Sequence, residues 1–160
     1  MTLHVGILTV SDRVSAGRME DRGGAAVEEA LGSLDIRVVR RQTVPDDRDQ
    51  IIATFEEWAD RQRLDLIFST GGTGLGPRDV TPEATLAACD RLVPGMAETM
   101  RAAGQSQTPY SMLSRGVVGV RGSTLIINLP GSPRGAAEGV AVLLPVLEHA
   151  VAILRGGSHE

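Results

Sequence analysis

The sequence predicts an α/β protein built on a mostly parallel sheet. Short apolar runs rich in β-branched residues alternate with segments of helical periodicity through the first half of the chain. The segments that join successive runs are long enough for crossover helices, which parallel strand pairing requires. No internal repeat is apparent, and 160 residues suit one domain. We therefore expect a single domain over residues 1–155 and a short disordered tail over residues 156–160.

The first half of the chain predicts three strands separated by two helices. Val5 to Val10 is an apolar run that ends at polar residues, as a first strand would. Apolar residues then recur at helical spacing over 25–34 and again over 49–62. The run over 36–44, between the two helices, is the second strand. The third strand, over 66–68, leads into a glycine-rich loop.

The second half predicts more helix and a weaker strand signal. Two helices are expected over 82–89 and 95–103, followed by a polar stretch and a short edge strand over 117–120. Residues 124–129, T-L-I-I-N-L, form the last central strand, because they are apolar apart from one threonine and one asparagine. The closing helix, over 135–154, contains a proline that is expected to kink it.

Charge and composition exclude several classes of protein. The formal net charge is −4, and the aromatic residues are two Phe, one Trp and one Tyr, so we expect no nucleic-acid-binding face. Cys89 is the single cysteine; it cannot form an intrachain disulfide and is predicted to be a small buried residue of a helix. The cytoplasm is the simplest compartment for such a chain.

Neither end of the chain predicts a membrane segment. The N-terminal residues lack a basic leader and a long apolar region, so they predict a strand and not a signal peptide. Residues 139–154 are largely apolar, but Pro145, Glu148 and His149 interrupt them. We therefore expect a core helix there and not a membrane span.

The densest chemical pattern lies between Leu64 and Thr85, which reads L-D-L-I-F-S-T-G-G-T-G-L-G-P-R-D-V-T-P-E-A-T. Glycines let main-chain N–H groups approach a ligand closely, so this loop suits phosphate oxygens. Within it, Arg78 can bind phosphate directly and Asp79 can hold the metal ion that accompanies phosphate. Thr81 predicts the N-cap of the next helix, with Pro82 at its first position, which adds a second anion-binding element.

Two common glycine-loop motifs are excluded. A Walker A loop ends in Gly-Lys-Ser/Thr, and the chain contains no lysine. A dinucleotide fingerprint starting at Gly72 and Gly74 would need a third glycine where Pro77 stands. A glycine-rich turn without a ligand is the remaining alternative. The adjacent Arg-Asp pair and the capped helix favour a ligand-binding loop over that alternative.

Four predicted strand ends carry polar, charged or glycine residues that could contact a ligand. They are Ser11-Asp12, Asp46-Asp47, the loop 71–79 and the segment 130–134. Ligands of open parallel sheets bind outside the carboxyl ends of the strands, where these loops converge. Asp46 and Asp79 are the hard oxygen ligands that a phosphate-bound Mg²⁺ prefers. The sequence therefore predicts a polyphosphate and magnesium site at this edge.

Each strand end also has a purely structural interpretation. Ser11 and Asp12 are as readily explained by capping or turning the chain as by contacting a substrate. Asp47 is better explained as the N-cap of the following helix. The segment from Pro130 to Pro133 also suits a rigid turn into the last helix.

No nucleophile and base stand in a recognisable arrangement. His4, His149 and His159 fall in the first strand, the last helix and the tail, so structural or solvated histidines are expected. Phosphoryl-type transfer needs alignment and charge neutralisation more than a catalytic triad. The absence of a triad therefore does not count against such a reaction.

Four motifs together resemble the molybdopterin adenylyltransferase family, the MogA-type enzymes of molybdenum cofactor synthesis, whose domain also occurs in gephyrin. They are T-V-S-D, V-P-D-D, S-T-G-G-T-G-L-G-P-R-D-V-T-P-E-A-T and L-P-G-S-P. The likeness extends from about Val5 to Leu154. It implies a three-layer α/β/α fold, a homotrimer, and a molybdenum insertase as candidate partner. It also implies transfer of AMP from MgATP to molybdopterin, with release of pyrophosphate.

The resemblance assigns residues as well. Asp46 and Asp79 match the family's catalytic aspartates and would hold the magnesium. The expected substrate-binding residues, including Arg78 from the loop chemistry above, are Ser11, Asp12, Gly71, Gly72, Thr73, Gly74, Arg78, Thr81, Glu83, Pro130, Gly131, Ser132 and Pro133.

Rival interpretations stay open. A MoaB-type relative shares the fold and the T-G-G-T-G loop and would bind molybdopterin without adenylylating it. The intact R-D-V-T-P-E motif favours an active enzyme, whereas the short chain without a long C-terminal extension is also MoaB-like. A CinA-type protein is the third candidate family. A pterin carrier or scaffold is the alternative outside enzymes, and the missing dinucleotide fingerprint disfavours a dehydrogenase.

Overall fold

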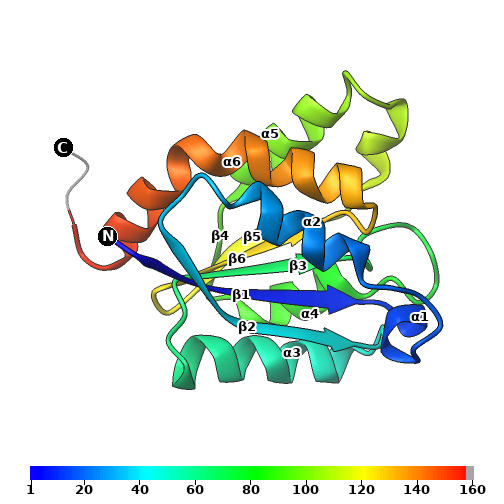
Figure 1. Cartoon of the computed structure of the whole chain (residues 1–160), viewed down its shortest axis with the longest axis horizontal. Coiled ribbons are helices and arrows are strands. Elements are labelled where there is room, and N and C mark those ends of the chain that lie inside the picture. The colour runs from blue at the N-terminus through cyan, green and yellow to red at the C-terminus, as the bar shows by residue number, and fades with distance from the viewer. Residues whose placement is uncertain (158–160) are drawn as a thin grey trace.

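A computed structural model describes residues 1–157 and contains one mixed sheet (Figure 1). Its spatial strand order is β2-β1-β3-β6-β5-β4. The first four of these are mutually parallel, β5 pairs antiparallel with β6, and β4 pairs antiparallel with β5. The strands are β1 (Leu3–Val10), β2 (Ile36–Val44), β3 (Leu66–Thr70), β4 (Arg91–Leu92), β5 (Val118–Arg121) and β6 (Thr124–Leu129). The predicted mostly parallel sheet is confirmed. Of the tail predicted at 156–160, residues 158–160 lie outside the described residues.

Helices cover both faces of the sheet, as the three-layer prediction requires (Figure 1). One face carries α2 (Arg22–Ala30), α5 (Pro94–Gly104) and α6 (Pro133–Leu154). The opposite face carries α3 (Arg48–Glu56), which continues as the π-helical turn η1 (Glu57–Arg61), and α4 (Thr81–Ala88). Two short elements lie in connections, α1 (Asp12–Ser15) and the 3₁₀ turn η2 (Pro109–Leu113).

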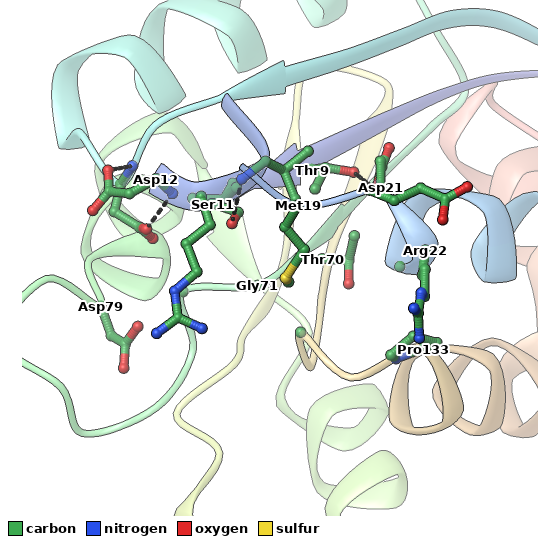
Figure 2. Close-up of a pocket in the computed structure, with 18 residues that line it drawn as sticks. Thr9, Ser11, Asp12, Met19, Asp21, Arg22, Thr70, Gly71, Asp79 and Pro133 are labelled. Atoms are coloured by element: carbon green, nitrogen blue, oxygen red, sulfur yellow. Dashed lines mark hydrogen bonds between the residues drawn. The ribbon is translucent and has the colours of Figure 1, made fainter. Parts of the chain in front are cut away.

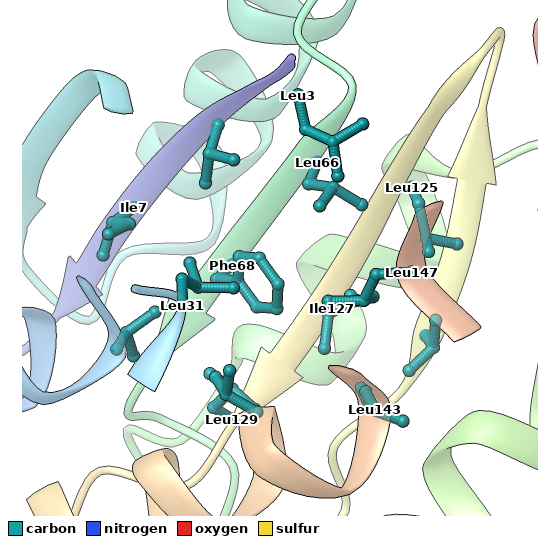
Figure 3. Close-up of a cluster of buried hydrophobic side chains, with 14 of the residues drawn as sticks. Leu3, Ile7, Leu31, Leu66, Phe68, Leu125, Ile127, Leu129, Leu143 and Leu147 are labelled. Carbon is teal, nitrogen blue, oxygen red and sulfur yellow. The ribbon is translucent and has the colours of Figure 1, made fainter. Parts of the chain in front are cut away.

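Two hydrophobic clusters hold these layers together, because successive residues of a strand point to opposite faces. Phe68 is fully buried in the cluster shared with α2 and α6 (Figure 3). Its neighbour Ile67 is fully buried in the other cluster, with residues of α3 and α4. Side chains of this size each contribute about 2–3 kcal/mol by leaving water. Burial on both faces explains why the central strands are apolar without alternation.

Helix α6 is a core helix, as predicted. By length and composition its 22 residues suffice to cross a membrane. Its side chains Val140, Leu143 and Leu147 nevertheless pack in the same cluster as Phe68. Pro145 is exposed, and the helix continues through it from Pro133 to Leu154.

One expectation about the remaining edge is wrong, and one strand there was not predicted. The strand predicted over 117–120 is β5, but it lies inside the sheet and not at its edge. The edge is β4, which the sequence did not predict. A two-residue strand shows no periodicity, and β4 is stabilised by main-chain bonds on either side, from Asp90 to the Val120 carbonyl (2.7 Å) and from Val93 to the Val118 carbonyl (2.8 Å).

The boundaries of one helix differ from the prediction because a capping residue extends its N-terminus. The helix predicted over 25–34 starts at Arg22, because the Asp21 side chain accepts a hydrogen bond from the Gly24 amide (2.9 Å). It ends at Ala30, and the residues up to Leu34 form a turn. The N-cap role predicted for Asp47 is confirmed, since its carboxylate accepts from the Gln50 amide (3.1 Å).

Cys89 lies directly after α4, half-buried against the second cluster. Burial, together with the negative charge of Asp90, raises the pKa of its thiol to about 11. Since only the thiolate reacts, we expect iodoacetamide at pH 8 to alkylate Cys89 about a hundredfold more slowly in the folded chain than in urea. Mass spectrometry of timed samples measures both rates. Equal rates would contradict the burial of this thiol.

Candidate functional site

A cavity of about 600 Å³ opens where β1 and β3 end and where α2 and α6 begin (Figure 2). It lies at the carboxyl edge of the parallel strands, the edge that the sequence predicted. Predicted site residues from all four strand ends line it: Ser11, Asp12, Asp46, Gly71, Gly72, Asp79, Gly131 and Pro133. Asp46 and Asp79 therefore lie on one cavity, although they are 33 positions apart in the chain.

Asp12 and Asp46 join the ends of β1 and β2 through a reciprocal pair of bonds. The Asp12 amide donates to the Asp46 carboxylate (3.0 Å), and the Asp46 amide donates to the Asp12 carboxylate (3.0 Å). Ser11 is the N-cap of α1, accepting from the Val14 amide (3.2 Å). The capping interpretation of Ser11 is thus correct, and its side chain still lines the cavity.

Arg78, which the sequence predicted to bind phosphate, forms an ion pair with Asp12 in this structure. Its Nε lies 2.6 Å and its Nη2 3.0 Å from the two carboxylate oxygens of Asp12. Nη2 also donates to the main-chain carbonyl of Asp46 (3.0 Å). This bidentate contact holds the pKa of the Asp12 carboxyl below its usual range. In this structure Arg78 therefore orients the two aspartates and does not line the cavity.

The electrostatics of the cavity favour a cation beside Asp46. Burial raises the pKa of this carboxyl, and the negative charges of Asp12 and Asp79 raise it further. A carboxylate that is partly desolvated and faces like charges is stabilised by a bound cation. Arg78 offsets only part of this charge because its guanidinium already neutralises Asp12.

Gly71 and Gly72 give the loop a shape that other residues would not adopt. Both have positive φ, +101° and +71°. A Cβ at Gly71 would collide with the carbonyl oxygen of Val10, and one at Gly72 with the hydroxyl of Thr81. Glycine therefore lets β3 turn sharply beside the end of β1, which exposes the loop to the cavity.

The N-cap role predicted for Thr81 is wrong. Thr81 is fully buried and is the first residue of α4; its hydroxyl donates to the Gly71 carbonyl (2.9 Å) and its amide to the Gly72 carbonyl (3.1 Å). Because the Thr81 hydroxyl donates to the Gly71 carbonyl, ten residues earlier in the chain, it does not cap the helix. Because the Thr81 amide is used and Pro82 has none, the first two positions of α4 offer no N–H group to an anion.

Some predicted substrate-binding residues do not line the cavity. Glu83 pairs instead with Arg115, 2.7 Å away. Pro130 and Ser132 line a second cavity of about 240 Å³ on the other side of their loop. The full set that does not line the first cavity is Thr73, Gly74, Arg78, Thr81, Glu83, Pro130 and Ser132.

The cavity is also lined by residues that the sequence did not predict as site residues. Thr9 and Thr70 point into the cavity from the ends of their strands, and the Thr9 hydroxyl donates to Asp21 (2.8 Å; Figure 2). Asp21 and Arg22 form the start of α2 at the cavity wall. The sequence pattern that could have indicated them is Asp21 followed two residues later by Gly23-Gly24. An aspartate there is a typical N-cap, and Gly23 allows the start of the helix to pack closely against Thr70 and the Gly131 carbonyl.

Comparison with known proteins identifies the family. The family model described as "Probable molybdopterin binding domain" matches residues 6–149. The chain belongs to this family of molybdopterin-binding domains.

Relatives within the molybdopterin-binding domain family include named enzymes. The chain is 38% identical to a molybdopterin adenylyltransferase of Helicobacter pylori strain J99, over 97% of this chain and 89% of that protein. It is 42% identical to the molybdopterin adenylyltransferase of Escherichia coli K12, over 86% and 71%. The crystal structure of the molybdopterin biosynthesis enzyme MoaB of Thermus thermophilus is 50% identical, with a TM-score of 0.92 over 99% of both chains. The predicted family and fold are confirmed.

The cavity suits a magnesium ion that arrives with a phosphorylated ligand. Among residues 1–157, no group of three or more His, Cys, Asp and Glu side chains is placed to hold a metal by itself. Mg²⁺ commonly binds one or two carboxylates together with substrate phosphates. Asp46 and Asp79 are two such carboxylates on one cavity beside a glycine loop, so the residues of this molybdopterin-binding domain fit the ion.

Proposed function

We propose that this chain is a molybdopterin adenylyltransferase that transfers AMP from ATP to the terminal phosphate of molybdopterin and releases pyrophosphate. One observation carries the proposal: Asp46 and Asp79 reach one cavity from separate strand ends, beside a glycine loop. Adenylyltransferases 38% and 42% identical to this chain, over most of its length, support it.

The reaction requires two anions to meet. An oxygen of the molybdopterin phosphate forms a bond to the α-phosphorus of ATP as the bond from that phosphorus to the β-phosphate oxygen breaks. The attacking phosphate is already ionised at neutral pH, so no protein base is needed. Magnesium bound by Asp46 and Asp79 would neutralise phosphate charge. The chain's own contribution is to hold both reactants in line and to donate the main-chain N–H group of Gly72, since the Gly71 amide already donates to the Leu129 carbonyl (3.1 Å).

Asp12 and Arg78 contribute by positioning. Their ion pair, together with the reciprocal bonds between Asp12 and Asp46, fixes the Asp46 carboxylate at the cavity wall. The N-termini of α2 and α6, and not that of α4, border the cavity and favour phosphate there.

The wider setting belongs to the same proposal. We assign residues 1–155 to one domain that works in the cytoplasm as a homotrimer. We also propose a molybdenum insertase as partner. A molybdenum cofactor biosynthesis bifunctional protein of Synechococcus elongatus supports this, because 48% of its length is 41% identical to this chain and the rest of it is a further segment.

Pyrophosphate release tests the function directly. Purified protein with ATP, Mg²⁺ and molybdopterin is expected to release one pyrophosphate per adenylylated pterin, and none when molybdopterin is omitted. A coupled phosphate assay after pyrophosphatase treatment measures the first quantity, and mass spectrometry measures the adenylylated product.

The 50% identity to a MoaB structure favours one alternative, a MoaB-type protein that binds molybdopterin without adenylylating it. Such a protein would quench or shift pterin fluorescence on binding and release no pyrophosphate. Together, these two results would contradict the adenylyltransferase function and support a molybdopterin-binding function.

A further inference from the structure

Arg115 holds the glycine loop from outside the cavity. It lies between η2 and β5, and it does not line the cavity. Its Nε donates to the Gly74 carbonyl (2.8 Å), and its Nη2 donates to the Asp79 carbonyl (2.8 Å). The Arg115 amide also donates to the Thr73 carbonyl (2.7 Å). One residue therefore binds the main chain near the start and at the end of the segment 73–79.

Glu83 fixes the orientation of this guanidinium. Arg115 Nη1 lies 2.7 Å from Glu83 Oε2, and Nη2 lies 3.2 Å from Oε1. The contact lowers the pKa of the Glu83 carboxyl and raises that of Arg115, so both groups are charged at neutral pH. A bidentate pair fixes the guanidinium plane, which aims the other N–H groups at the loop carbonyls.

Among the described residues, the one side chain apart from Arg115 that ties the segment 73–79 to the rest of the chain by hydrogen bonds is Arg78, which pairs with Asp12 (2.6 Å) and donates to the Asp46 carbonyl (3.0 Å). Within the segment, Gly76 and Asp79 exchange two bonds, from the Gly76 amide to the Asp79 carboxylate (2.9 Å) and from the Asp79 amide to the Gly76 carbonyl (3.0 Å). Its one large apolar side chain, Leu75, is 67% exposed and does not anchor it. Two glycines leave its backbone many accessible conformations. Arg78 acts through its side chain, whereas Arg115 bonds the main chain of Asp79 itself, so the position of the Asp79 carboxylate depends on the contacts of Arg115 as well as on those of Arg78.

We propose that Arg115 is a positioning residue for the reaction: it fixes the loop so that the Asp79 carboxylate faces the cavity, and Glu83 is its counter-ion and not a substrate ligand. This inference rests on the proposed adenylyltransferase function. A displacement of about 1 Å in a catalytic group can lower a rate about a hundredfold.

The test compares Arg115→Met with a matched control, Arg121→Met. Arg121 ends β5; it bonds the end of α4 through the Ala88 carbonyl (2.7 Å) and forms an ion pair with Asp60 of η1 (2.8 Å). It lies at the opposite end of α4 from Glu83 and does not line the cavity. Both variants lose an arginine that bonds main chain and carboxylate, so general destabilisation affects them alike.

Three results are expected. Arg115→Met lowers kcat about tenfold to a hundredfold and raises the Mg²⁺ concentration for half-maximal rate, while the KM for molybdopterin changes by less than about threefold. Arg121→Met leaves all three within about twofold of wild type. In the double variant Arg115→Met with Asp79→Asn, kcat is no lower than in Asp79→Asn alone, because Arg115 acts through Asp79.

Hydrogen exchange supplies a readout independent of activity. Amides of the peptide 71–80 are expected to exchange faster in Arg115→Met than in wild type, with no change in that peptide in Arg121→Met. Equal exchange of that peptide in all three proteins would overturn the proposal, as would a kcat for Arg115→Met that equals that of Arg121→Met. A wild-type protein that releases no pyrophosphate would overturn the proposed function itself.

Discussion

Replacing Asp79 with asparagine is expected to lower the rate of molybdopterin adenylylation by about a hundredfold or more, while the chain folds and binds the pterin. Asparagine preserves the size of the side chain, and its amide oxygen still accepts the Gly76 bond. It removes the negative charge that would hold magnesium beside Asp46. Loss of one preorganised electrostatic group at a reacting phosphate typically has this magnitude. Steady-state pyrophosphate release and pterin binding by fluorescence measure the two effects.

Asp47→Asn is the matched control for this variant. Asp47 neighbours Asp46 in the V-P-D-D motif, but it caps α3 and does not line the cavity. Asparagine is as good an N-cap as aspartate, so stability and rate should stay within about twofold of wild type. Near-normal turnover by Asp79→Asn would remove Asp79 from the mechanism.

Replacing Gly71 with alanine is expected to lower the free energy of unfolding by about 2–4 kcal/mol. The added Cβ meets the Val10 carbonyl, which is main chain and cannot rotate away. Relief of the collision would separate the ends of β1 and β3, so we also expect adenylylation to fall at least about tenfold. Urea denaturation measures the first effect and pyrophosphate release the second.

Gly122→Ala separates the cost of the backbone conformation from that of the collision. Gly122 also has positive φ (+58°), but a Cβ there meets nothing within 4 Å. Its substitution should cost about 1–2 kcal/mol and leave the rate unchanged. A Gly71→Ala variant no less stable than Gly122→Ala would contradict the close approach of the loop to β1.

Periodicity and strand-end chemistry predicted much of the fold and the place of the site. The central strands were recognisable because burial on both faces makes them apolar throughout. Ser11, Asp46 and Gly71 were recognisable because the carboxyl ends of parallel strands converge, so polar and glycine residues that follow separate strands lie together. Their catalytic and binding roles remain predictions.

The missed features depend on contacts that the sequence does not encode locally. Arg115 lies 41 residues from Gly74 in the chain, and neither periodicity nor a motif links the two. Thr81 had the residue type and position of an N-cap, but a buried hydroxyl donates to whichever carbonyl the fold brings near it, here that of Gly71. Strand β4 was too short to show a pattern, and its pairing comes from β5.

Anomalous diffraction from a crystal grown with Mn²⁺ and a non-hydrolysable ATP analogue tests the site most directly. We expect one strong manganese peak in the cavity, about 2.0–2.6 Å from a carboxylate oxygen of Asp46 and one of Asp79 and bound to phosphate oxygens. A peak coordinated by other residues, or a nucleotide bound away from the loop 71–79, would contradict the assignment of this cavity as the reaction site.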